Sequence, residues 1–138
     1  MIKQTITYND YNGMERTEDF YFNLTEVELM NMNLEHVNLQ DKMRALVNAK
    51  DMQAIMKLIT KIIYQSHGVK SDDGKHFRKS DEISTSFMQS PAYTVLFMDM
   101  LKGKIDPVKF IKGIVPSDIA KKIPDNAEDI QVQLEAAN

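Results

Sequence analysis

The residues that could perform chemistry in this chain are three histidines, a set of serines and a few neighbouring carboxylates. His67, Asp72, Asp73 and His76 crowd one polar segment, and such side chains could hold a metal ion. Their spacing matches no ligand pattern of known geometry, so a solvated turn is the favoured interpretation. None of the serines lies in a nucleophile elbow, and the glycines stand singly rather than in a phosphate-binding loop. We therefore expect no catalytic residue, no metal, no cofactor and no enzymatic activity.

Binding of another protein is the more promising function, and the methionines are the first candidates for a binding surface. Ten methionines occur, among them Met52, Met56 and Met88 on predicted helices. Thioether side chains are flexible and polarizable, so they suit a groove that accepts varied partners. Ordinary filling of the core is the favoured alternative for most of them.

A basic segment is the second candidate for binding. It carries Lys75, Arg78 and Lys79 within a polar connection between two predicted helices. An electrostatic patch for an acidic partner is the functional interpretation, and a solvated loop is the alternative. We expect a client groove formed by residues 51–67 and 88–100, with the basic loop 70–79 at its rim.

Length and composition agree with a soluble interaction protein. The chain has 138 residues, which fits one domain, and it contains no cysteine for disulfides or thiolate metal sites. No stretch is apolar for long enough to span a membrane. Residues 1–51 and 123–138 are mainly acidic and residues 52–122 are mainly basic. This distribution disfavours a nucleic-acid partner, which requires a dominant basic face, and suits docking on a protein.

The pattern of residues predicts an α+β fold that is mainly α. Residues 1–23 alternate in polarity around a turn at 9–13, which predicts a β-hairpin. Residues 25–123 predict five to six short-to-medium helices, including a weakly predicted one at 39–49 and one that Gly68 ends. Their starts are marked by Thr25, Asp51, Ser80, Ser90 and Asp106, and Ser117 is expected to cap one more turn. We expect the hairpin to pack on this bundle in one globular domain, residues 1–124, followed by an acidic, mobile tail, residues 125–138.

One predicted helix organises the rest of this fold. Ser90 and Pro91 are a strong start signal, and Gly103 is a good stop. The residues between them are apolar almost all round the helix, apart from Thr94, Asp99 and Lys102. A helix with so little polar surface is normally buried, so we predict that this is the most buried helix of the protein.

Several segments together resemble a known family. Gly68–Ser71, the turn Asp73-Gly74, Lys79-Ser80, Ala92-Tyr93 and Leu96–Met98 follow one another as in the tail assembly chaperones of long-tailed, siphovirus-type phages and of prophages of Gram-positive bacteria. The opening segment, residues 5–29, and the closing segment, residues 110–116, are similar to the ends of that family's pattern.

This resemblance implies a phage tail assembly chaperone that acts in the cytoplasm of the bacterial host. Such proteins bind the tape-measure protein and keep it soluble until the tail tube forms around it, so the tail tube protein is a second expected partner. The resemblance implies no nucleic-acid or membrane partner, and the oligomeric state stays open. The alternatives are a structural tail protein that remains in the virion, and a small helical DNA-binding regulator.

Overall fold

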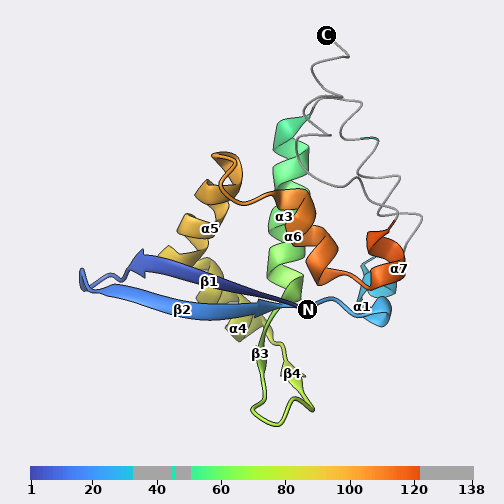
Figure 1. Ribbon diagram of the computed structural model, residues 1–138, viewed down its shortest axis with the longest axis horizontal. Helices are drawn as coiled ribbons and strands as arrows, with labels where there is room; N and C mark the ends of the chain where they lie inside the picture. The colour runs from blue at the N-terminus through green and yellow to red at the C-terminus, as the bar shows by residue number, and fades with distance from the viewer. Residues whose placement is uncertain (33–44, 46–50, 122–138) are drawn as a thin grey trace.

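The structure is a computed structural model that describes residues 1–32, 45 and 51–121, without the side chain of Met52. Most of the helices lie on one side of the long N-terminal hairpin, which belongs to a small antiparallel sheet (Figure 1). This arrangement confirms the predicted α+β class with mainly helical content. The elements in chain order are β1 (Ile2–Asn9), β2 (Glu15–Phe22), α1 (Glu26–Asn31), α3 (Met52–Ser66), β3 (His67–Lys70), β4 (Phe77–Arg78), α4 (Asp81–Met88), α5 (Pro91–Leu101), α6 (Pro107–Ile114) and α7 (Ser117–Ala120).

The predicted N-terminal hairpin is formed by β1 and β2. Its register runs from Ile2 opposite Phe22 to Asn9 opposite Glu15. Ile6 is buried while its neighbours Thr5 and Thr7 are exposed, as the alternation of the sequence predicts. The loop covers residues 10–14, one position later than predicted, because Asn9 still pairs within the ladder.

β3 and β4 extend this hairpin into a four-stranded sheet with the order β1-β2-β3-β4. Gly68 in β3 pairs with Tyr21 near the end of β2, and this added strand supports a hairpin that would be marginal alone. The sequence suggested that Gly68 ends the preceding helix, but α3 ends at Ser66. Gly68 instead allows close strand approach: a Cβ there would lie 2.7 Å from the backbone oxygen of Arg78.

Local capping explains where the helices begin. The Thr25 hydroxyl accepts from the backbone N–H of Glu28, and the Glu28 carboxylate accepts from the N–H of Thr25, which completes the predicted capping box. The predicted caps of the later helices are also present, at Asp51, Ser80, Ser90 and Asp106. The prediction of a cap at Ser117 is wrong, because Ser117 is already the first residue of α7 and follows Pro116.

The core lies between the sheet and the helices, and α3 and α6 contribute most to it. Five apolar residues of α3 are buried, and so are four of α6. The prediction that α5 is the most buried helix is wrong. Only Ala92, Leu96 and Met100 of α5 are buried, whereas Met98 is 38% exposed and Leu101 50% exposed. α5 packs against β1 along one face, and the described residues place no second layer over its other face.

Some predictions concern residues that the structure does not describe. The acidic tail, residues 125–138, and a weakly predicted helix at 39–49 lie outside the described residues, apart from position 45. Among the described helices, none combines the length and the apolar character that a membrane crossing requires.

Candidate partner-binding surfaces

The methionines predicted to bind a partner are mostly engaged with the core. Met56 on α3 and Met88 on α4 are half-buried and pack against the buried apolar cluster. Met52 is the first residue of α3, and its side chain lies outside the described part of the structure. Packing in the core therefore explains much of the position of the Met56 and Met88 side chains, and part of each side chain stays exposed.

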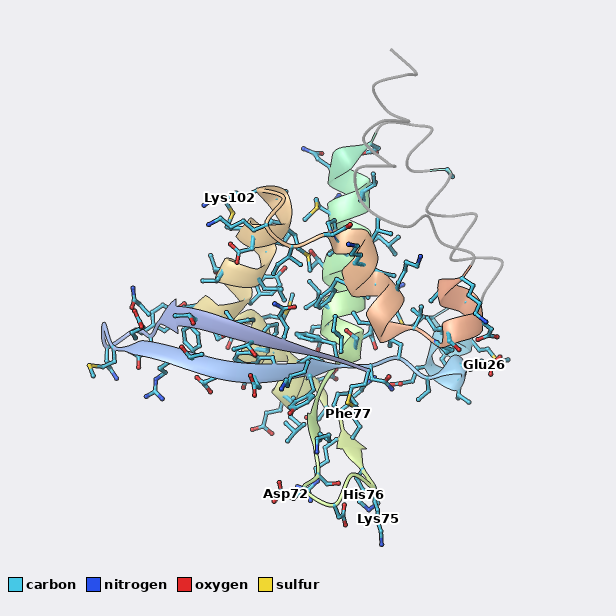
Figure 2. All side chains as sticks on the ribbon, in the orientation of Figure 1. Glu26, Asp72, Lys75, His76, Phe77 and Lys102 are labelled. Carbon is cyan, nitrogen blue, oxygen red and sulfur yellow. The ribbon has the colours of Figure 1, made fainter. Side chains whose placement is uncertain are left out.

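The predicted basic loop forms the turn between β3 and β4. Its hydrogen bonds centre on Asp73, which accepts from the Ser71 hydroxyl at 2.7 Å and from the backbone N–H of Lys75 at 3.0 Å. These donors lower the pKa of Asp73, with the Lys75 N–H as the first cause. Gly74 has a φ of 76°, which glycine adopts without strain. The turn is thus rigidly built, and it presents Lys75 at the tip of this hairpin (Figure 2).

Lys75 and Arg78 are exposed and form no ion pair among the described residues. Lys79 differs from them. Its ammonium lies 2.6 Å from Oε2 of Glu28 and donates to the backbone oxygen of Asn23 at 2.5 Å. Lys79 therefore fastens the start of α4 to the capping box of α1, and its charge is already neutralised within the molecule.

The expected groove does not have the basic loop at its rim, because the methionines at the start of α3 and the loop lie apart. Met52 and Met56 lie in the first turns of α3, whereas the loop follows the last turn. Ser66 lies ten positions after Met56 in this helix, about 15 Å away at 1.5 Å per residue. In Figure 1 the β3–β4 hairpin projects beyond the end of α3, away from the start of that helix. The methionines and the loop are two separate candidate surfaces.

His67 and His76, the histidines that the structure describes, lie in different surroundings. His67 is buried between the rings of Phe20, Phe22 and Phe87, with its centroid 4.6 Å from that of Phe87. Burial lowers the pKa of His67, and a contact of its Nδ1 with the backbone oxygen of Tyr21 offsets this only in part. His67 is therefore a buried residue of the core. The described residues contain no group of three or more possible ligands.

A surface that the sequence did not reveal lies where α5 faces α3. The Thr60 hydroxyl of α3 lies 3.4 Å from the Tyr93 hydroxyl of α5, so the two helices meet at this level. They run in opposite directions, so from this contact the start of α3 and the end of α5 extend towards the same end of the molecule (Figure 1). Phe97 is half-buried, and Met98 and Leu101 are exposed. Apolar composition predicted burial here, so only the structure could show that this face is open.

Comparison with known proteins gives one match. The family model described as phage tail assembly chaperone matches residues 1–138, which is the whole chain. No curated protein and no solved structure matches the chain. A chaperone family points to a non-enzymatic role. The chain belongs to the phage tail assembly chaperone family.

Proposed function

We propose that this protein binds the tape-measure protein of its phage and keeps it soluble for assembly of the tail tube. A tape-measure segment that exposes an apolar helical stripe aggregates, because apolar area removed from water contributes about 25 cal/mol per Å². The observation that carries the proposal is the open apolar face of α5, where the apolar side chains of Met98 and Leu101 are exposed. Such a face covers a client stripe and releases it again.

We also propose where the protein acts and which partners it binds. Binding occurs in the cytoplasm of the bacterial host before the tail is complete, and the tail tube protein is a second partner that displaces the chaperone from its client. Met52, Met56 and Met88 are proposed to contact the client, with Lys75 and Arg78 as a separate, screened contact. For Lys79 we propose a structural contribution, because its ammonium is held by Glu28.

Co-expression with the cognate tape-measure protein tests this function. The soluble yield of the tape-measure protein should rise with the wild-type chaperone, and the double variant Met52→Glu, Met56→Glu should lose the effect. Met14→Glu is the matched control, because Met14 is 64% exposed in the loop of the β1–β2 hairpin. Circular dichroism of each variant checks folding. If the wild-type protein neither binds nor solubilises the tape-measure protein, the proposal is wrong.

A structural tail protein retained in the virion is the second candidate function. The observation in its favour is the sheet edge: β1 is an outer strand that, among the described residues, pairs only with β2. An open edge of eight residues offers backbone groups to a neighbouring strand. Mass spectrometry of purified tails distinguishes the two, since only a retained component persists there in stoichiometric amounts.

A further inference from the structure

We use the name α3–α5 seam for the half-buried or exposed apolar residues that lie from the contact of these two helices towards the start of α3 and the end of α5, namely Met56, Phe97, Met98 and Leu101. Thr60 and Tyr93 meet across it at 3.4 Å. One turn towards the start of α3 lies Met56, and one turn towards the end of α5 lies Phe97. Met98 and Leu101 follow towards the end of α5. All four of these side chains are half-buried or exposed, and none of them is ionised.

Positive charge borders this seam on two sides. Lys57 and Lys61 follow Met56 and Thr60 directly in α3 and are exposed. Lys102 and Lys104 are exposed at the end of α5, where Figure 2 labels Lys102. Among the residues that the structure describes, none of these four lysines forms an ion pair, since the two ion pairs there join Arg16 to Asp10 and Lys79 to Glu28.

An apolar strip between unpaired cations fits one kind of partner by charge complementarity. We infer that the α3–α5 seam binds an amphipathic helix whose apolar stripe is flanked by glutamate or aspartate side chains. The stripe covers Phe97, Met98 and Leu101, and the carboxylates pair with the lysines on either side. This inference rests on the proposed function, because it specifies the chemistry of the client segment. The β3–β4 loop has no part in this contact.

The flanking lysines also give selectivity to a surface whose apolar contacts alone discriminate weakly between client helices. Apolar contacts of methionine and phenylalanine accept many sequences, so they discriminate weakly between client helices. Four lysines attract helices with acidic flanks and repel helices with basic flanks. The chaperone thereby selects acidic-flanked segments of a long helical client by their charge and does not require a specific sequence.

Fluorescein-labelled synthetic helices test the inference with the full-length protein. Both peptides have about 18 residues, five helical turns, and the same leucine stripe, but one carries glutamates and the other lysines beside the stripe. Anisotropy titrations should show at least about tenfold tighter binding of the glutamate peptide at about 50 mM salt, and a smaller ratio at about 500 mM. Equal affinities at low salt would overturn the inference.

Surface variants locate the binding. Leu101→Glu and the double variant Lys57→Glu, Lys61→Glu should each weaken binding of the glutamate peptide by about tenfold or more. Met14→Glu is the control for an exposed apolar side chain, and the double variant Lys75→Glu, Arg78→Glu is the control for charge. Both controls should bind like the wild type. Loss of binding in the loop variant with retention in Leu101→Glu would place the site elsewhere and overturn the inference.

Two further outcomes separate this inference from the proposed function. If the wild-type chaperone solubilises the tape-measure protein and Leu101→Glu does so equally well, the seam is not the client site although the function stands. If the peptides behave as expected but the tape-measure protein is neither bound nor solubilised, the function fails and the seam stands. Sedimentation of the free protein tests a second copy as occupant: a dimer that Leu101→Glu dissociates would overturn the inference.

Discussion

The ammonium of Lys79 lies 2.6 Å from the carboxylate of Glu28, a residue 51 positions earlier in the chain. Glu28 also accepts from the backbone N–H of Thr25, so one carboxylate caps α1 and anchors the start of α4. Burial tends to raise the pKa of Glu28, but its hydrogen bonds with Lys79 and Thr25 hold the pKa below its ordinary value. This pair joins the N-terminal half of the fold to the β3–β4 hairpin.

Replacing Lys79 by Met should therefore lower the free energy of unfolding by about 1–3 kcal/mol, because a half-buried carboxylate loses its cation. Urea titrations measure this, with Lys75→Met as the control that should change stability by less than about 0.5 kcal/mol. The contribution of Glu28 is present above its unfolded pKa and disappears as the pH falls through the lower folded pKa. Lys79→Met should weaken that acid dependence. Equal stability of both variants would show that the pair is only a surface contact.

The buried His67 should make stability depend on pH in a different range. Its pKa is lowered on folding from an ordinary value of 6.5, so the unfolded chain takes up the proton more readily. Stability should be complete above the unfolded pKa and should fall as the pH drops through 6.5 towards the folded pKa. His67→Leu should remove this decline, while His76→Asn, on the exposed turn, should keep it. A decline that persists in His67→Leu would assign it to other groups.

Two leucines of α5 report how that helix is packed. Leu96 is fully buried, so Leu96→Ala should cost about 2–5 kcal/mol of unfolding free energy. Leu101 is 50% exposed, and Leu101→Ala should cost less than about 1 kcal/mol. Denaturant midpoints of both variants measure the difference. Similar losses at the two positions would mean that α5 is buried on both faces in solution.

Two glycines should respond differently to a methyl group. At Gly68 a Cβ would lie 2.7 Å from the backbone oxygen of Arg78, and a strand backbone cannot move without breaking its pairing with β3. Gly68→Ala should therefore cost about 1–3 kcal/mol. At Gly113 the nearest atom is the terminal methyl of the Ile2 side chain at 3.1 Å, and alanine gains about 1 kcal/mol of helix propensity. Gly113→Ala should be near neutral in thermal melts, and a larger loss there than at Gly68 would contradict this packing.

Local signals in the sequence predicted the elements well. A cap such as Ser90 followed by Pro91, or a turn such as Asp73-Gly74, depends on neighbours within a few residues, so the sequence carries the whole interaction. The two strands of the hairpin followed from alternation for the same reason, although the loop lies one position later than predicted.

Long-range relationships could not be predicted in this way. The ion pair of Lys79 with Glu28 depends on how α4 and α1 meet, so the sequence presented Lys79 as one more cation of a basic loop. The apolar composition of α5 indicates only that exposure of this helix to water is unfavourable. Whether the core or a partner covers Met98 and Leu101 depends on tertiary packing, which is why the prediction of burial failed and why the α3–α5 seam appeared only in the structure.

We propose that the protein accompanies the tape-measure protein before tail assembly and leaves afterwards. The most direct measurement is quantitative mass spectrometry of tape-measure complexes captured from phage-producing cells, compared with purified mature tails. We expect abundant chaperone on the captured tape-measure protein and only trace amounts in mature tails. Absence from the captured complexes, or a stoichiometric presence in mature tails, would contradict it.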